Sequence, residues 1–167
     1  MFFAFWGSFL RSEKLQNHLN SLGFEPKRVI VRVPLRIPEE LFKYSPKDFK
    51  ISTPEEIGKS FEENSLIKAS YFSKKTYLLC LSDDSGLEID LLNGDPGIYS
   101  SRWSGSNHDF NLAIKKVFGE MNKIKKDWKN DSAARFVCCL TLFWPNGKSY
   151  LGKGVVNGKI STKQKGN

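Results

Sequence analysis

The feature that most constrains the fold is an almost continuously apolar run from Ala134 to Trp144. A β-rich run without polar alternation is typical of a central strand that is buried on both faces. Asn146-Gly147 follows directly, and this dipeptide is a strong hairpin signal. The next run, from Lys148 to Val156, is therefore expected to return as the neighbouring strand.

Helical signals precede this hairpin. Ser60 and Glu63 have the spacing of a capping box and are followed by a helical apolar pattern. The clearest apolar stripe predicts a helix over His108–Ile124, and a shorter one predicts a helix over Leu15–Leu22, before Gly23. Strands are expected over Phe2–Trp6, Val29–Val33 and Tyr77–Leu81. Helices and strands alternate before the strands pair, which predicts an α/β domain with a mixed sheet.

The length and composition indicate one globular domain. The chain has 167 residues, of which 40% are hydrophobic and 26% charged. Its net charge of +8 favours anionic partners, although lysines spread along the chain also describe a solvated surface. Three cysteines without a disulfide pattern favour reduced thiols in a cytoplasmic protein. Two histidines without partners at ligand spacing argue against a zinc site or a Ser-His-Asp triad.

The segment Asp83-Asp84-Ser85-Gly86 is the strongest candidate for chemistry. Two adjacent carboxylates at the end of a buried strand would suit a hard cation such as Mg²⁺, which bridges to substrate phosphates. A nearby carboxylate can then take a proton from an attacking water. The alternative interpretation is an ordinary turn, because Asp, Ser and Gly are common turn residues.

A second acidic pair, Glu55-Glu56, follows Thr53-Pro54. One interpretation is a helix start, with Thr53 as the cap and the acids facing the helix dipole. The other makes one of the two acids a metal ligand opposite Asp84. Asn64 and Lys68 are four residues apart and share a helix face, directed either at substrate phosphates or at water.

Four segments in a fixed order carry a family resemblance: Pro54–Gly58, Ser60–Ala69, Ser82–Asp90 and Leu92–Arg102. Together with Asp109-x-Asn111 and Ala134–Cys138, they closely resemble the inosine/xanthosine triphosphate pyrophosphatase family, the Ham1-like group. The Asp-Asp-Ser-Gly-Leu and Gly-x-Pro-Gly-Ile-Tyr-Ser stretches are highly specific, and the similarity runs from about Pro54 to Gly166.

The resemblance implies a two-lobed α/β fold of the Maf/Ham1 kind, with a long mixed β-sheet flanked by helices. It implies hydrolysis of non-canonical purine nucleoside triphosphates (ITP, dITP, XTP) to the monophosphate and pyrophosphate, with Mg²⁺ as cofactor. It further implies a homodimer. No nucleic-acid partner is expected, because the chain lacks a recognised binding motif, and no membrane partner, because the apolar start Phe2–Trp6 is too short to span a membrane.

Site residues carry over by matching positions. The resemblance makes Asp84 a metal ligand and the proton acceptor, with Asp83 in support and Ser85 touching substrate. Glu55 would be the second metal ligand, although Glu56 is adjacent and remains an alternative. Two further side chains would face the substrate phosphates: Lys68 and Asn64.

Two departures from the family pattern are expected to matter. The family's phosphate loop T-G-N-x-x-K corresponds here to Trp6–Arg11, in which Arg11 keeps only the positive charge. The family also continues past the position of Asn167 with a G-F-G-Y-D segment, a further Lys and a late S-H-R. The expectation is therefore a single domain over 1–167, divergent at 1–50 and truncated at the C-terminus. The alternative function is an inactive remnant with residual metal or nucleotide binding.

Overall fold

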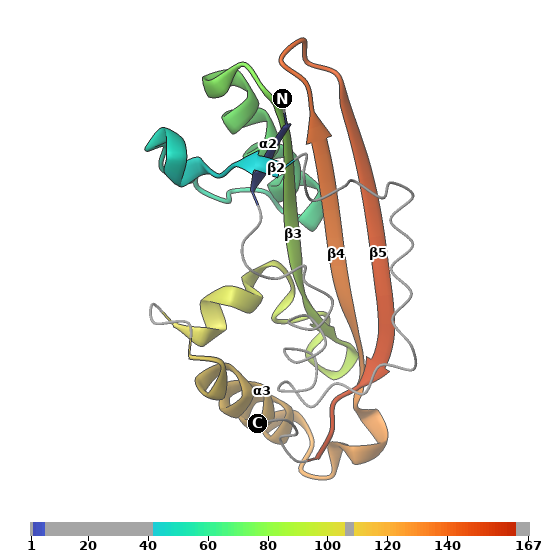
Figure 1. The fold of residues 1–167 in the computed structure, drawn as a ribbon. Helices are drawn as coiled ribbons and strands as arrows, with labels where there is room; N and C mark the ends of the chain where they lie inside the picture. Colours follow the sequence, from blue (N-terminus) through green and yellow to red (C-terminus); the bar gives the residue numbers. More distant parts are fainter. Residues whose placement is uncertain (1, 6–41, 106–108, 163–167) are drawn as a thin grey trace. The chain divides into compact units, whose positions relative to one another are not determined.

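The computed structural model describes residues 2–5, 42–105 and 109–162 (Figure 1). The predicted helix over Leu15–Leu22 and the predicted strand over Val29–Val33 lie outside these residues, as does Arg11.

The strands form one mixed sheet in the order β2-β1-β3-β4-β5. Their bounds are β1 Phe2–Phe5, β2 Phe42–Tyr44, β3 Leu79–Ile89, β4 Ala133–Phe143 and β5 Ser149–Lys159. Strand β1 runs parallel to both β2 and β3. Strands β4 and β5 form the expected antiparallel hairpin, which the Trp144 N–H closes by donating to the Lys148 carbonyl at 2.8 Å. The predicted α/β class with a mixed sheet is confirmed.

Two α-helices lie in the described residues, α2 over Phe61–Thr76 and α3 over Phe110–Ile124. Ser60 caps α2 by accepting from the Glu63 N–H at 3.1 Å, but the Glu63 carboxylate accepts from the Lys59 N–H at 2.6 Å. The predicted capping box is therefore only half formed, because the Glu63 carboxylate bonds to Lys59, the residue before the cap, instead of to the backbone of Ser60. Short 3-10 helices complete the structure: η2 Pro46–Phe49, η3 Asp90–Leu92, η4 Gly97–Ser104 and η5 Trp128–Asp131.

Two interpretations based on local composition are wrong. The Asp83–Gly86 segment is not a turn but the middle of β3, which lies beside β4 in the sheet and pairs with β1 over Leu79–Ser82. The helix start at Thr53–Glu56 is also wrong, since residues 51–60 contain no helix and α2 begins at Phe61. The N–H groups of Gly58 and Lys59 bond to side chains of α2 rather than to a preceding helical turn.

The chain divides into two compact units. Unit 1 comprises 1–8, 31–84 and 138–154, and unit 2 comprises 9–30, 85–137 and 155–167. In unit 2, nine buried residues form one hydrophobic cluster: Leu87, Ile89, Leu92, Val117, Met121, Trp128, Ala134, Phe136 and Ile160. In unit 1, Phe72 and Cys80 form a smaller one, with half-buried Tyr44, Ile51, Tyr71 and Leu78 packed against it. Within the described part of the chain, no helix is long and apolar enough to cross a membrane.

Candidate active site

Strand β3 places Asp84 on the face that α2 covers. Burial alternates along the first half of the strand, so that Cys80, Ser82 and Asp84 are buried while their neighbours are half-buried. The Ser82 hydroxyl donates to the Ser65 carbonyl of α2, which fixes the helix over this part of the strand. Asp84 is 8% exposed, and its carboxylate is thereby held against the first two turns of α2.

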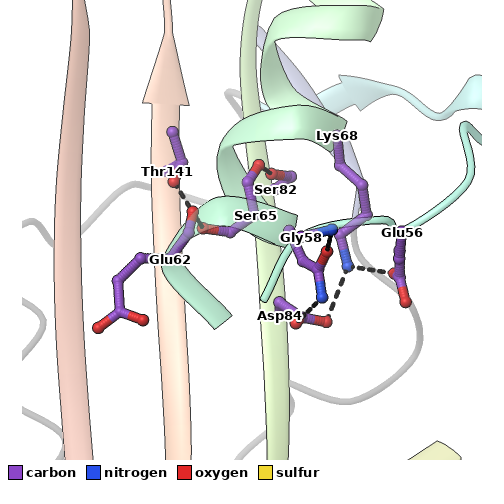
Figure 2. Close-up of polar contacts among 9 residues, drawn as sticks. Glu56, Gly58, Glu62, Ser65, Lys68, Ser82, Asp84 and Thr141 are labelled. Carbon is purple, nitrogen blue, oxygen red and sulfur yellow. Dashed lines mark hydrogen bonds and ion pairs between the residues drawn. The ribbon is translucent and has the colours of Figure 1, made fainter. Parts of the chain in front are cut away.

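Lys68 of α2 joins two carboxylates that are far apart in sequence. Its Nζ lies 3.2 Å from Asp84 Oδ1 and 2.7 Å from Glu56 Oε1 (Figure 2). The lysine is 5% exposed, so the ammonium is neutralised by these carboxylates rather than by water. The structure therefore brings Glu56, Lys68 and Asp84 into one buried charge cluster.

Asn64 holds the other oxygen of Asp84. Its Nδ2 donates to Asp84 Oδ2 at 3.2 Å, and its Oδ1 accepts from the Gly58 N–H at 2.9 Å. Asn64 precedes Lys68 by one helical turn, so both side chains reach Asp84 from the same face of α2. This shared face was predicted from the sequence.

The cluster shifts the pKa values of its members. Burial raises the pKa of Asp84 to about 6 from its ordinary 3.8, opposed by the Lys68 charge, aided by the Glu56 charge and opposed by the Asn64 hydrogen bond. Burial disfavours the Lys68 ammonium, but the charge of Asp84 and the hydrogen bond to Glu56 outweigh it, so the pKa of Lys68 is raised. The lysine stays charged while the aspartate titrates close to neutrality.

The donor set fits a hard divalent cation. Glu56 and Asp84 supply two carboxylates against one ammonium, and the charge of Asp83 also reaches Lys68. Mg²⁺ is typically bound through one or two carboxylates and keeps several waters. In the described ranges, no three His, Cys, Asp or Glu side chains form a metal-holding cluster by themselves.

Three further site residues were predicted from the sequence: Asp83, Ser85 and Glu55. Asp83 and Ser85 flank Asp84 on β3, and the period of two along a strand directs them to its other face. Glu55 is exposed, whereas its neighbour Glu56 contacts Lys68. The roles proposed for these three residues stay predictions. The geometry favours Glu56 over Glu55 as the second acid of the site.

A profile of the Ham1 family matches residues 30–167. The chain belongs to the Ham1 family. A dITP/XTP pyrophosphatase of Bacillus licheniformis is 38% identical over 112 residues, which cover 67% of this chain and 56% of the relative. Another, from Rhizobium meliloti, is 40% identical over 151 residues, which cover 88% of this chain and 62% of the relative. The chain thus spans little more than half the length of these curated relatives.

Solved Ham1 structures share the fold. A HAM1 protein from Coxiella burnetii superposes with a TM-score of 0.70 at 30% identity, covering 97% of this chain and 73% of that protein. The Ham1 protein of Staphylococcus aureus superposes with a TM-score of 0.62 at 34% identity, covering 71% of this chain and 59% of that protein. These matches confirm the predicted Ham1-like α/β fold.

The sequence reasoning missed what holds the Ham1 site together. Gly58 contacts Asn64, and the buried hydroxyls of Ser65 and Thr141 meet at 2.7 Å between α2 and β4 (Figure 2). A glycine just before a helix cap is a usable signal for close backbone approach. Hydroxyl pairing between distant elements leaves no pattern in a single sequence.

Proposed function

We propose that this chain hydrolyses non-canonical purine nucleoside triphosphates, such as dITP, ITP and XTP, to the monophosphate and pyrophosphate. The observation that carries the proposal is the buried Glu56–Lys68–Asp84 cluster in a chain of the Ham1 family. Relatives that share 38–40% identity with the chain are dITP/XTP pyrophosphatases. Because the chain spans only part of those relatives, its own activity needs a direct test.

Asp84 is the proton acceptor in this proposal. Its pKa of about 6 keeps the carboxylate mostly ionised at neutral pH and leaves it basic enough to take a proton from an attacking water. Lys68 and Asn64 each hold one carboxylate oxygen, which orients the remaining lone pairs. Glu56 keeps Lys68 in place through its 2.7 Å ion pair.

The cofactor is proposed to be Mg²⁺, held by Asp84 and by Glu56, or by Glu55 as the sequence resemblance implies. When bound, such an ion polarises the phosphoryl oxygens and offsets their charge. Asp83 and Ser85 are proposed to act from the other face of β3, in support of Asp84 and in substrate contact. Lys68 has a third donor hydrogen beyond its two carboxylate contacts, which is available to a substrate phosphate.

The remaining proposals concern the whole protein. We infer a cytoplasmic homodimer with no nucleic-acid or membrane partner, and a single domain over 1–167. The family resemblance supports the dimer, and Tyr150, Leu151 and Val155 of β5 provide exposed apolar area for a contact. Light scattering over a range of protein concentrations measures the oligomeric state.

The test is pyrophosphate release from dITP, XTP and ATP with Mg²⁺. We expect Asp84→Asn to lower kcat by about 100-fold or more, because it removes the proton acceptor. Asp131→Asn, an equal change at an exposed acid of unit 2, should retain activity. If the folded wild type releases nothing above Asp84→Asn yet binds nucleotide or metal, the alternative of an inactive family member replaces this proposal.

A further inference from the structure

The segment that carries Glu56 has no secondary structure to hold it. Residues 51–58 form neither helix nor strand, yet Glu56 reaches Lys68 at 2.7 Å. Two backbone contacts fasten the segment to α2: the Gly58 N–H bonds to Asn64 Oδ1, and the Lys59 N–H bonds to Glu63 Oε2. These bonds, two and three residues further along the chain, help to hold Glu56 at Lys68.

Asn64 connects this segment with Asp84. Its Oδ1 accepts from Gly58, so its Nδ2 is the end that faces Asp84, and the two contacts fix the orientation of the amide. The side chain is 1% exposed, and both its ends are engaged within the protein. Asn64 is thus placed to orient Asp84 and the Glu56 segment, and the substrate contact that the resemblance implies for Asn64 stays a prediction.

Gly58 makes the close approach possible. A Cβ at this position would lie 2.6 Å from Asn64 Oδ1, 2.8 Å from Glu63 Cβ and 3.0 Å from the Asn64 backbone nitrogen. Two of these atoms belong to the fixed first turn of α2, so any side chain at Gly58 pushes the segment off the helix. Gly58 is not among the described glycines with positive φ, so space and not backbone conformation is the requirement.

We propose that Gly58 and Asn64 are positioning residues that set Glu56 and Asp84 on either side of Lys68. Their catalytic value rests on the proposed function, but the arrangement itself does not. Outer partners that orient metal-binding carboxylates typically change metal affinity or activity by about 10–100-fold when mutated. Loss of either residue should therefore weaken binding of a divalent cation even where the fold survives.

The first test is hydrogen exchange at the Gly58 amide in the metal-free full chain. Exchange should be slow in the wild type and faster in Asn64→Ala, which removes the acceptor. Asn64→Asp keeps an oxygen for Gly58 but places an acceptor against Asp84, so it should preserve slow exchange at Gly58. Equal exchange in the wild type and Asn64→Ala would overturn the proposal.

The second test is calorimetric titration with Mn²⁺ alone, beside kcat and KM for dITP. For Gly58→Ala we expect about 10-fold weaker Mn²⁺ binding and a fall in kcat of about 10-fold or more, with KM within about threefold. Gly152→Ala is the matched control, because its Cβ would meet nothing within 4 Å. Unchanged Mn²⁺ affinity in Gly58→Ala contradicts the proposal, whatever the activity.

The proposed function and the positioning roles of Gly58 and Asn64 are tested by different measurements. A wild type that releases no pyrophosphate from any nucleotide removes the proposed function, while exchange at Gly58 and Mn²⁺ affinity still decide the positioning roles. Circular dichroism shows whether each variant is folded. If Gly58→Ala does not fold, Asn64→Ala and Asn64→Asp carry the comparison, since both keep the glycine.

Discussion

At the scale of single residues, ionisation of Asp84 lowers the free energy of unfolding. Its pKa rises from 3.8 in the unfolded chain to about 6 in the folded one, so the folded chain binds the proton more tightly. The stabilisation that comes from this tighter proton binding is fully present below pH 3.8 and is lost as the pH rises through 6. We expect metal-free Asp84→Asn to be more stable than the wild type at about pH 8, by on the order of 3 kcal/mol at most.

Urea unfolding in the presence of a chelator measures this difference. It should shrink as the pH falls through 6 toward 3.8, because the carboxyl of the folded wild type is then protonated and no longer carries a buried charge. Asp131→Asn is the control, since Asp131 forms an exposed ion pair with Lys125 and such pairs contribute little to stability. A variant that is less stable than the wild type at alkaline pH would show that the Lys68 pair outweighs the burial of Asp84.

How far the sequence predicts the site depends on regular structure. Asn64 and Lys68 were predicted to share a helix face because the period of α2 is readable from spacing. The choice between Glu55 and Glu56 could not be made, because residues 51–58 have no period that assigns side chains to faces. The contact of Glu56 with Lys68 and that of Gly58 with Asn64 join parts of the chain that no local pattern links.

At the scale of elements, buried hydroxyls hold α2 on the sheet. Ser65 donates to the Glu62 carbonyl at 3.0 Å, which leaves Thr141 of β4 as the donor to Ser65 at 2.7 Å. Ser65→Ala and Thr141→Val each leave a buried polar group without its hydrogen-bond partner, at a cost of about 1–3 kcal/mol of stability. Because the two share one hydrogen bond, the double variant should lower the free energy of unfolding by less than the sum of the two single variants. The difference should be about 1 kcal/mol or more.

Chemical unfolding of the single and double variants gives this coupling energy. Ser132 provides the comparison, because its hydroxyl bonds to the Lys129 carbonyl in unit 2 and shares no partner with Ser65. Ser65→Ala combined with Ser132→Ala should be additive within about 0.5 kcal/mol. Additive costs for Ser65 and Thr141 would mean that their contact contributes nothing to docking α2.

Elements were predictable where local and tertiary preferences agree. The apolar stripe predicts α3, and Asp109 caps it at the expected end. Strand β3 was predicted too short, because Asp83–Gly86 has turn composition while the strand that lies beside it in the sheet, β4, comes from a distant part of the chain. Pairing over such sequence separations is invisible to local composition.

At the scale of the molecule, the candidate site lies in the unit with the smaller described core. Unit 1 contains Glu56, Lys68 and Asp84, and its buried cluster is formed by Phe72 and Cys80. Unit 2 has the larger cluster around Met121. Among the described residues, the smaller cluster beside α2 predicts lower protection against hydrogen exchange in α2 than in α3, because fewer buried apolar contacts lower the free energy of local opening.

The difference in protection between α2 and α3 lets hydrogen exchange detect ligand binding without turnover. A ligand that binds only the native state stabilises what it binds, by about 3 kcal/mol at a hundredfold excess over its Kd. We expect Mg²⁺ with a non-hydrolysable dITP analogue to slow exchange in α2 much more than in α3. Asp84→Asn should abolish this slowing, whereas Asp131→Asn should preserve it. Equal slowing of both helices would mean that the ligand stabilises the chain as one cooperative body, and slowing confined to α3 would place the binding site in unit 2.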